Sequence, residues 1–558
     1  MFFWKNKVPR AAAARHIDLS PDLPYIVHRN VLLSELAHVQ KCGHLNIEPV
    51  CEVGFKFWLF HAILSPMSLK SAAIIAEFNP FHKGHLYLMQ KAREAAGDAC
   101  LAVIMSGDFV QRGAPAIFDK YVRTEAALSC GADLVIELPL PYSCASSEFF
   151  ASGALSIVKG LNVFSHLVFG SESGDIRKLQ SAAESTLSES ADFKTRIRES
   201  LASGHSYSRA YAEAYSKDLC QNDFRQADSS QADFNQTVFS QSDSCQADFN
   251  HSSFSQADFS QTDSCQASFS QADPCQADSS RTNRDQFRQE AWCNSSNRSP
   301  FYSPNDTLGI EYLRAIKRSD IPITPICIKR EEKEPYASAS RLREIILSHC
   351  KESPTETLQA LANSGLQALS AYLPKPSIEV LIKALTLGQG PLSIDDFSKE
   401  IRYSLLEKLS DPKRTSGFFG TDLEMRIRRL LSEYRSASSF LSLLKSKNFL
   451  YTSLSRSLIH SLLNINQSQI RDLKFKGYPV YARILGFKKS SSDLVSEIME
   501  KSQIPVIMKP SEWEKALPPV LHPIWHLGTF SNTLYGAALR DTYGTDYPNE
   551  YQRKLIVI

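Results

Sequence analysis

Two histidines separated by a lysine and a glycine are the residues of this chain best arranged for chemistry. In residues 74–88, IIAEFNPFHKGHLYL, an apolar run ends, a proline-containing turn follows, and His82-Lys83-Gly84-His85 begins a predicted helix. Side chains three residues apart at a helix start lie on the same side, where free backbone N–H groups and the positive end of the helix dipole converge. Gly84 has no side chain to keep a phosphate away from the backbone.

Such a group of donors suits attack at the α-phosphate of a nucleoside triphosphate, because charge then grows on phosphoryl oxygens and on the departing pyrophosphate. The two histidines alone would also fit an accidental surface pair or a pair of metal ligands. Their position directly after the first predicted strand of an α/β sheet favours the phosphate site. The chain has no CxxC pair and no His/Cys cluster with zinc spacing, so no metal site is predicted.

Short apolar runs rich in β-branched residues alternate with helical periods around this motif. They predict strands over residues 71–78, 100–106, 134–138, 166–169 and 323–328. Between and after them, helices are predicted over residues 86–96, 121–130, 148–159, 176–187, 307–318 and from 338 to 348. This alternation is typical of an α/β fold with a doubly wound, Rossmann-like parallel sheet. Beyond residue 350 the period is mainly helical.

The sheet is interrupted by a low-complexity insertion. Residues 221–280 form twelve pentads such as QADFN, and with nine Asp, one Arg and no Lys their net charge is −8. Seven pentads have Phe at the fourth position and five have Ser or Pro, so a β-helix core would be broken. Because burial so sparse cannot offset the ordering cost of about 1–2 kcal/mol per residue, we favour an expanded insertion over a short β-helix.

Length and composition place these elements in domains. A chain of 558 residues exceeds a single core. We expect an N-terminal extension over 1–66, which a start codon placed too far upstream would also explain, and an α/β domain in two parts, 67–216 and 301–350. The insertion covers 217–300 and a mainly helical domain covers 351–558. No apolar run reaches the ~20 residues that cross a bilayer, and scattered cysteines favour reduced thiols, so we predict a cytoplasmic protein without a membrane segment.

Several segments together resemble one family. EFNPFHKGH (77–85), MSGDFVQRGAPAIFDKYVRTEAAL (105–128), GADLVIELPLPYS (131–143), VFGSESGDI (168–176) and SPNDTLGIEYLRAI (303–316) are similar, in order and spacing, to the tRNA(Met) cytidine acetate ligase family of the HIGH-type nucleotidyltransferase superfamily. LKSKNFLYTSLSR (444–456) and YARILGF (481–487) continue the resemblance. It implies an enzyme that uses ATP to convert acetate into acetyl-adenylate and acetylates the 4-amino group of the wobble cytidine in elongator tRNA(Met).

The resemblance also implies site residues. His82 and His85 would be catalytic, stabilising the transition state at the α-phosphate and the leaving pyrophosphate. The implied ATP-binding residues are Ile75, Ala76, Glu77, Phe78, Asn79, Pro80, Phe81, His82, Lys83, Gly84, His85, Leu86, Tyr87, Leu88, Gly170, Asn305 and Arg330. Gly170 would leave room for a base or ribose, Asn305 would bond a sugar hydroxyl or the adenine edge, and Arg330 would hold phosphate oxygens. Without the family match, a turn glycine, a helix cap and a surface arginine would explain these three.

A second tier of positions is assigned less closely. Ser338, Ser340 and Arg343 stand where the superfamily keeps a phosphate-binding loop and helix start. Lys83 replaces the Asn usual between the histidines, and either adds a cation near the phosphates or points to solvent. Four residues in the closely matching segment 105–128 have no assigned role: Gln111, Arg112, Lys120 and Arg123.

The C-terminal region carries a strong positive charge that the net charge of the whole chain, +2, does not reveal. Residues 401–490 contain 17 Lys+Arg and 6 Asp+Glu, a balance of +11, interleaved with aromatic residues. Cations contact phosphates and aromatic rings stack on unpaired bases, whereas a solvated helical face with buried rings would give the same composition. The tRNA-binding candidates are Arg426, Arg428, Arg429, Lys445, Lys447, Arg456 and Arg483. The departure TDLEMR (421–426) from the family's usual EGLENR falls in this region.

The resemblance therefore implies an acetate- and ATP-dependent tRNA ligase, with ATP as co-substrate accompanied by Mg²⁺. Residues 67–216 and 301–350 would be its nucleotidyltransferase domain, and residues 351–558 its tRNA-binding domain. Its partners would be acetate and elongator tRNA(Met), and no obligate protein partner is inferred. Two alternatives remain open: an adenylyltransferase of the same superfamily acting on a small molecule, and a non-catalytic RNA-binding protein. The long basic region disfavours the first, and the intact histidine motif disfavours the second.

Overall fold

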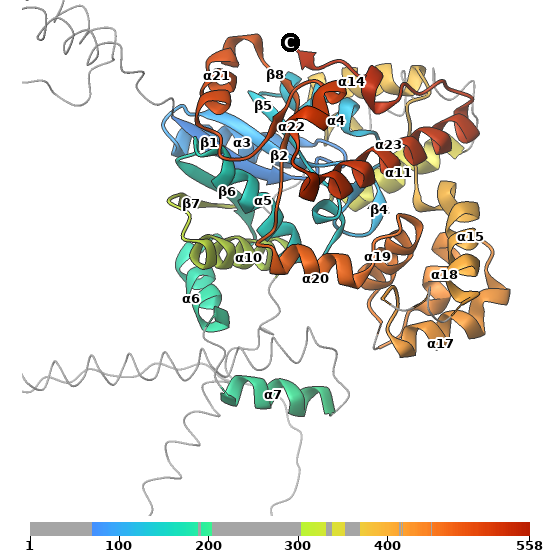
Figure 1. Ribbon diagram of the computed structural model, residues 1–558. Coiled ribbons are helices and arrows are strands. Elements are labelled where there is room, and N and C mark those ends of the chain that lie inside the picture. Colours follow the sequence, from blue (N-terminus) through green and yellow to red (C-terminus); the bar gives the residue numbers. More distant parts are fainter. Residues whose placement is uncertain are drawn as a thin grey trace, which may run out of the picture. The chain divides into compact units, whose positions relative to one another are not determined.

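A mostly parallel β-sheet with helices on both faces positions the histidine motif (Figure 1). The computed structural model describes residues 70–187, 191–202, 303–330, 338–351, 369–411, 415, 417–447 and 449–558. The N-terminal extension and the pentad repeats lie outside the described residues, as does the segment just after residue 351. The residues from Leu69 onward belong to one compact unit.

The main sheet has eight strands, seven of which follow the order β10-β8-β5-β2-β1-β6-β7, with β9 paired to β8. All neighbours are parallel except β5 and β8. The strands are β1 (Ser71–Ala76), β2 (Cys100–Ser106), β5 (Leu134–Leu138), β6 (His166–Ser171), β7 (Thr324–Lys329), β8 (Ala482–Phe487), β9 (Val506–Ile507) and β10 (Ile556–Val557); β3 (Phe109–Val110) and β4 (Ala114–Pro115) form a separate hairpin.

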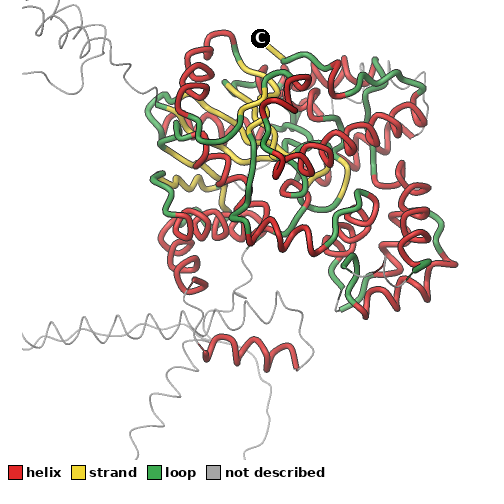
Figure 2. Tube along the Cα trace, viewed as in Figure 1, coloured by secondary structure: helices red, strands yellow, loops and turns green. Residues whose placement is uncertain are grey.

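Helices account for most of the remaining described chain (Figure 2). They are α3 (Lys83–Ala95), α4 (Lys120–Ser129), α5 (Ser147–Leu161), α6 (Ile176–Leu187), α7 (Ala191–Ala202), α10 (Pro304–Ser319), α11 (Ala339–Lys351), α14 (Lys375–Thr386), α15 (Ser398–Leu409), α17 (Thr421–Leu430), α18 (Ala437–Leu444), α19 (Tyr451–Leu462), α20 (Gln467–Phe475), α21 (Ser492–Lys501), α22 (Trp513–Ala516) and α23 (His522–Tyr543). Within the described residues, none is long and apolar enough to cross a membrane.

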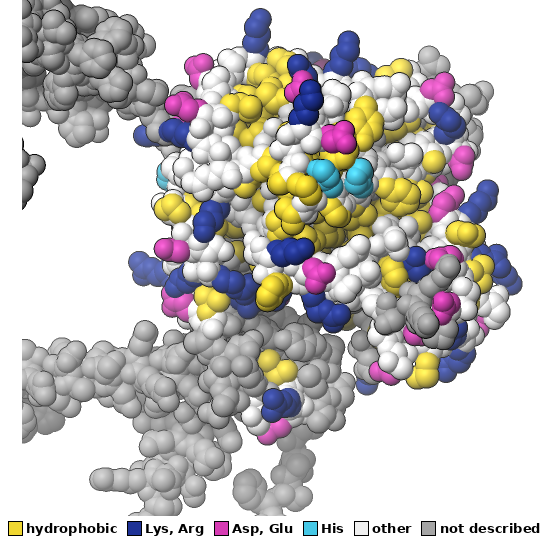
Figure 3. Space-filling model, in the orientation of Figure 1, with side chains coloured by type: hydrophobic (Ala, Val, Ile, Leu, Met, Phe, Trp, Pro, Cys, Tyr) yellow, Lys and Arg dark blue, Asp and Glu magenta, His cyan; other side chains and the backbone are white. Residues whose placement is uncertain are grey.

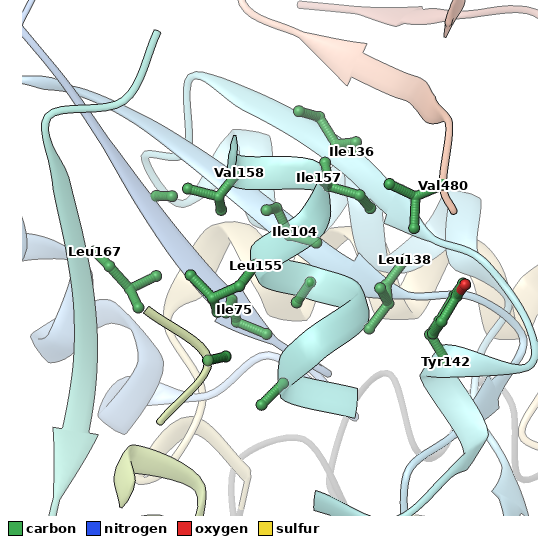
Figure 4. Packing of buried hydrophobic residues seen from close by; sticks show 14 of the residues in the cluster. Ile75, Ile104, Ile136, Leu138, Tyr142, Leu155, Ile157, Val158, Leu167 and Val480 are labelled. Carbon is green, nitrogen blue, oxygen red and sulfur yellow. The ribbon is translucent and has the colours of Figure 1, made fainter. Parts of the chain in front are cut away.

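Alternate residues of each central strand face two separate cores, as a doubly wound sheet requires. Ile75 and Ile104 point toward α5, α6 and α10, where Leu155 and Leu167 join them (Figure 4). On the opposite face, Ile74 and its neighbours pack against α3, α4, α11 and α14. Both faces are buried, which explains why the strands are continuous apolar runs rather than alternating patterns.

The predicted fold class is confirmed. The five predicted strands are β1, β2, β5, β6 and β7, which pair in parallel with one another, and the predicted helices occur with shifts of a few residues at their ends. A third hydrophobic cluster, from α15, α17, α18, α19 and α23, forms the helical C-terminal region. The C-terminal part of the chain also contains three strands, β8, β9 and β10, which belong to the main sheet.

The strand β8 was not predicted as a strand. It runs antiparallel to β5, with Ile136 opposite Ile484 and Glu137 opposite Arg483. Its sequence, ARILGF, is a short apolar run amid helical periods, and a run of that length does not distinguish a strand from a buried helix. The sheet therefore includes a strand from the end of the chain, more than 300 residues from its neighbour. The predicted helical domain and the sheet share this element.

Candidate active site

The predicted nucleotide-binding residues meet at the carboxyl ends of β1, β6 and β7, which are neighbours in the sheet. Open α/β sheets bind ligands along this edge. Directly after β1, Phe78 adopts a left-handed backbone conformation, with φ at 48°. That conformation is uncommon for a non-glycine residue and is found at functional turns. His82 then becomes the N-cap of α3.

The two histidines cap this helix together. The Nδ1 atom of His82 accepts a hydrogen bond from the backbone N–H of Gly84, at 3.1 Å, and Nδ1 of His85 accepts one from the backbone N–H of His82, at 3.3 Å. Their rings stack, with centroids 3.7 Å apart and an interplanar angle of 22°. Because both Nδ1 atoms are acceptors, each neutral ring carries its proton on Nε2. Each ring can therefore donate an N–H to a phosphate.

Both imidazoles are neutral near pH 7. Burial, reinforced by the charges of Arg330 and Arg343, lowers the pKa of His82 to about 4. Burial, followed by the charges of His82 and Arg330, lowers the pKa of His85 well below its usual value. Arg330, which lowers both pKa values, and Arg343, which lowers that of His82, add positive charge beside the pair. The site thus combines neutral N–H donors with fixed guanidinium cations, which suits a polyanionic ligand.

Aromatic residues of the turn pack against the ring of His85. The Phe78 ring lies 4.8 Å and the Phe81 ring 5.6 Å from the ring of His85, between centroids, and both phenylalanines are buried. Asn79 is also buried, and its Oδ1 accepts a hydrogen bond from the N–H of Ile117. These three predicted ATP-binding residues therefore build the turn. The catalytic role of the two histidines stays a prediction.

Lys83 takes a position that the sequence did not suggest. Its Nζ donates to the carbonyl of Ala371, at 2.8 Å, and its backbone N–H donates to the carbonyl of Tyr372. The ammonium group therefore ties the start of α3 to the segment before α14. The Lys83 ammonium is therefore held by a backbone carbonyl at the surface, and its contribution to phosphate binding stays a prediction.

A carboxylate that sequence reasoning did not single out organises the second half of the site. Glu172 follows β6 and accepts hydrogen bonds from Ser303, from Asn305 Nδ2 at 2.6 Å and from Arg330 at 3.2 Å. Asn305 and Arg330, which are far apart in the sequence from Glu172, are therefore held on one side chain. The signal was available, because Glu172 is an acid three residues after the strand predicted over 166–169.

Gly170 lies at the end of β6, opposite Ile328 of β7. A Cβ atom added there would lie 3.7 Å from the Cγ atom of Arg330, which is ordinary van der Waals contact. A methyl group would therefore fit beside the Arg330 stem, so neither the available space nor the backbone conformation requires glycine here. Room for a base or ribose at this position stays a prediction.

Of the second-tier candidates, Arg343 is the one that reaches the histidine turn. It donates to the carbonyl of Asn79, at 2.8 Å, and to Ser340 Oγ, at 3.0 Å. Ser338 Oγ accepts from the N–H of Arg341 and so caps the start of α11. Arg343 is thus fixed beside the site, Ser340 orients it, and Ser338 is a helix cap.

Three of the residues without an assigned role now have structural contacts. Arg123 is buried and donates to the carbonyls of Glu77, Ser106, Gly107 and Phe118, so it joins the ends of β1 and β2. The backbone N–H of Gln111 donates to Glu77 Oε1, at 2.9 Å, so Gln111 contacts the residue that follows β1.

The third, Lys120, is buried between Glu137 of β5 and Glu550 near the end of the chain, at 2.8 and 2.7 Å. The remaining residue of the four, Arg112, is exposed, and its charge contributes to the lowered pKa of Arg343. Arg112 is therefore another cation near the site.

The tRNA-binding candidates differ in how accessible they are. Arg429, Lys445 and Lys447 are exposed on α17 and just after α18. Arg426 donates to the carbonyls of Leu443 and Leu444, and Arg428 donates to the carbonyl of Leu409 and to Glu424.

The other two candidates are drawn into the protein. Arg456 is partly buried and donates to the carbonyl of Gln111 at 3.4 Å. Arg483 is only 4% exposed and pairs with Glu550 inside the sheet region. The guanidinium of Arg483 is therefore not at a surface where it could contact RNA phosphates, because β8 carries it into the core.

In the described part of the chain, no group of three or more His, Cys, Asp or Glu side chains could hold a metal ion. Cys100, Cys130, Cys144 and Cys327 are free thiols.

Comparisons with known proteins identify the family of this chain. The model of the family described as HIGH Nucleotidyl Transferase matches residues 69–546. A protein of Acetivibrio thermocellus named tRNA(Met) cytidine acetate ligase is 28% identical over 499 residues, covering 88% of this chain and 100% of that protein. A protein of Halothermothrix orenii with the same name is 30% identical over 438 residues, covering 78% of this chain and 86% of that protein.

Solved structures show the same fold. The crystal structure of Thermotoga maritima TmcAL bound with alpha-thio ATP has a TM-score of 0.65 to this chain at 22% sequence identity. The match covers 88% of this chain and 100% of the Thermotoga protein.

Proposed function

Because the chain belongs to the tRNA(Met) cytidine acetate ligase family of HIGH-type nucleotidyltransferases, we propose that it uses ATP to acetylate the 4-amino group of the wobble cytidine in elongator tRNA(Met), through acetyl-adenylate. The observation that carries this proposal is the neutral histidine pair at the start of α3, flanked by Arg330 and Arg343. As a tRNA-modifying enzyme it would act in the cytoplasm.

In the first step, an acetate oxygen attacks the α-phosphorus of ATP while the bond to the bridging oxygen breaks. Pyrophosphate leaves with the electron pair, so no proton is transferred and no general base is needed, because acetate is already ionised. His82 and His85 donate Nε2–H bonds to the phosphoryl oxygens as charge develops. The α3 N-terminus and the two arginines add fixed positive potential in the same place.

Each half of the site has a distinct part in binding ATP. Glu172 holds Asn305 and Arg330 where β6 and β7 end, a position suited to ribose hydroxyls and phosphate oxygens. Asn79 and Phe78 fix the turn that places the histidines, and Arg343 ties that turn to α11. Mg²⁺ would arrive bound to the triphosphate and neutralise part of its charge.

In the second step, the 4-amino nitrogen of cytidine attacks the carbonyl carbon of acetyl-adenylate. AMP departs with the electron pair of the carbon–oxygen bond, and the nitrogen loses one proton. The RNA must therefore reach the same sheet edge as the nucleotide. Exposed cations of the helical region, Arg429, Lys445 and Lys447, are proposed to hold its phosphates at a distance from the chemistry.

One experiment tests the proposal against its alternatives. The protein is incubated with ATP and labelled acetate, with and without tRNA(Met), and pyrophosphate, acetyl-adenylate and acetylated RNA are measured. We expect acetate-dependent pyrophosphate release without RNA, and N4-acetylcytidine only when tRNA(Met) is present. Pyrophosphate release that ignores acetate but responds to another small acid or phosphoester would favour the small-molecule adenylyltransferase. RNA binding without any pyrophosphate release would favour the non-catalytic protein.

A further inference from the structure

The most exposed large hydrophobic side chain in the described chain is Phe475, the last residue of α20, which is 93% exposed. Full exposure of an aromatic ring to water is unfavourable, and exposed apolar groups can mark binding sites. The rest of α20 is conventionally amphipathic, because Ile470 and Leu473 pack against the hydrophobic core. Phe475 lies on the opposite, solvent-facing side, so packing of the helix does not account for it.

Cations surround this ring in the sequence and at the surface. Lys474 and Lys476 flank it directly, and Arg471 precedes it by one helical turn; all three are exposed. Asp472 is the single acid of the Arg471–Gly477 tip. An exposed ring between cations is the arrangement that binds single-stranded nucleic acid, in which a base stacks on the ring and adjacent phosphates contact the cations.

The tip is anchored on the catalytic side of the sheet. Lys474 donates to Glu148 of α5, at 2.8 Å, and the Tyr478 ring contacts the ring of Phe149, with centroids 5.5 Å apart. The start of α5 follows the carboxyl end of β5. The tip is therefore held at the same edge of the sheet as the histidines.

A short chain of contacts links this anchor to the site. Ser147, next to Glu148, accepts a hydrogen bond from Gln111 Nε2 at 3.0 Å. The backbone N–H of Gln111 in turn donates to Glu77, directly after β1. Figure 3 shows one face of the molecule, on which Lys and Arg side chains lie around a broad hydrophobic area.

We propose that Phe475 stacks on an unpaired base of the RNA substrate while Arg471 and Lys476 contact phosphates beside that base. Lys474, paired with Glu148, holds the tip on α5. The inference rests on the proposed function, which makes the RNA a tRNA presenting an unpaired anticodon loop. It extends that function by assigning a base-stacking residue outside the segments that suggested the family. Phe475 is a positioning residue: it holds the loop and leaves the chemistry to the sheet.

The test measures RNA affinity alone, without ATP or acetate, so that it does not depend on the proposed reaction. Phe475→Ala, Phe475→Leu and Phe475→Trp are titrated with unmodified tRNA(Met) at several salt concentrations. Loss of one stacked base weakens binding by about 5- to 100-fold, so Ala and Leu should fall in this range while Trp keeps the affinity. The salt slope should stay unchanged in all three, because stacking releases no counterion.

The cations that contact phosphates should behave in the opposite way. In the double variant Arg471→Gln/Lys476→Gln, which keeps the Lys474–Glu148 pair, the slope of log affinity against log salt should become shallower by about 0.7 for each phosphate that the protein no longer neutralises. Tyr403→Ala is the matched control, because Tyr403 is an aromatic residue of α15 that is 72% exposed without belonging to the tip. Its RNA affinity should equal that of the wild type.

Other outcomes would overturn the proposal. Unchanged affinity in Phe475→Ala would remove the ring from the RNA interface, and equal weakening in Tyr403→Ala would reduce the effect to general surface hydrophobicity. If Phe475→Ala instead abolished a concentration-dependent self-association seen by sedimentation while RNA affinity stayed constant, the ring would belong to a protein interface. Failure of acetylation in the wild type, with RNA binding sensitive to Phe475, would refute the proposed reaction and leave the stacking role standing.

Discussion

The backbone N–H of His82 donates to the imidazole of His85, and the imidazole of His82 in turn accepts from the N–H of Gly84. This reciprocal capping makes the two side chains part of the helix start as well as candidates for catalysis. It also fixes the tautomer, because an Nδ1 atom that accepts a hydrogen bond leaves the proton on Nε2. The hydrogen bonds that form the start of α3 therefore also orient the Nε2–H donors of the two histidines.

Because His82 has two roles, substitutions can separate them. His82→Asn keeps an N-cap oxygen but removes the Nε2–H donor, so adenylation should fall by ~10²–10³ with little loss of thermal stability. His82→Ala should lose the same activity and about 1 kcal/mol of stability in addition. Pyrophosphate release and Tm are measured side by side for both, with His85→Ala expected to match the loss of rate. Near-normal rates in His82→Asn and His85→Ala together would remove the histidines from catalysis.

A buried histidine outside the site predicts a pH dependence of stability. Burial is the main cause that lowers the pKa of His460 to about 4, and its Nε2 contacts the carbonyl of Cys144. The unfolded chain, with a pKa near 6.5, binds the proton more readily. The contribution of neutral His460 to the free energy of unfolding is therefore fully present above pH 6.5. It declines by up to about 3 kcal/mol as the pH falls from 6.5 toward 4. Urea unfolding at pH 7 and pH 4.5 should show a smaller loss in His460→Gln than in the wild type; equal losses would contradict the assignment.

Arg123 should contribute strongly to the stability of the fold, because several backbone carbonyls accept hydrogen bonds from its guanidinium group. Its guanidinium donates to four backbone carbonyls at once. Lysine has one nitrogen in place of the planar fork, so Arg123→Lys leaves buried carbonyls unsatisfied and should cost roughly 2–4 kcal/mol. Arg341→Lys on α11 is the control and should change Tm little, because Arg341 is exposed and pairs with the equally exposed Glu344. A neutral result for Arg123→Lys would mean that water replaces the missing donors.

The proposed RNA surface of the helical region is best tested with its exposed cations. Neutralising Arg429, Lys445 and Lys447 to Gln should weaken tRNA binding and reduce the salt slope by about 0.7–0.9 for each phosphate left without its cation, while acetate-dependent pyrophosphate release stays unchanged. Arg426→Gln should behave differently and lower Tm, because Arg426 caps the carbonyls at the end of α18. Unaltered RNA binding in the triple variant would place the tRNA elsewhere.

Two long segments should be dispensable. A chain that starts at Met67 and has a short Gly/Ser linker in place of residues 222–285 should remain soluble and keep adenylation. The reason is that β1 begins at Ser71 and α10 at Pro304, so every strand of the sheet lies outside both deletions. Circular dichroism and the pyrophosphate assay check the result. Loss of folding would show that one segment is structural, and single deletions would identify which.

The sequence alone determined the features that depend on local pattern. The strands β1, β2, β5, β6 and β7 appear as continuous apolar runs because the sheet is covered on both faces, and the helices between them show a regular period. The motif at residues 82–85 was identifiable because a strand end, a turn and a helix start are neighbours along the chain. Family resemblance added Gly170, Asn305 and Arg330, whose types alone would have suggested ordinary turn, cap and surface residues.

Only the tertiary structure decided which distant residues meet. Glu172 joins Asn305 to Arg330, Lys120 meets Glu550, and β8 enters the sheet from the end of the chain. None of these pairings has a local signature, because each forms between segments separated by more than 100 residues. Burial also depends on such packing. Arg483 and Arg429 are equally basic in the sequence, but a core strand hides the first and a helix surface exposes the second.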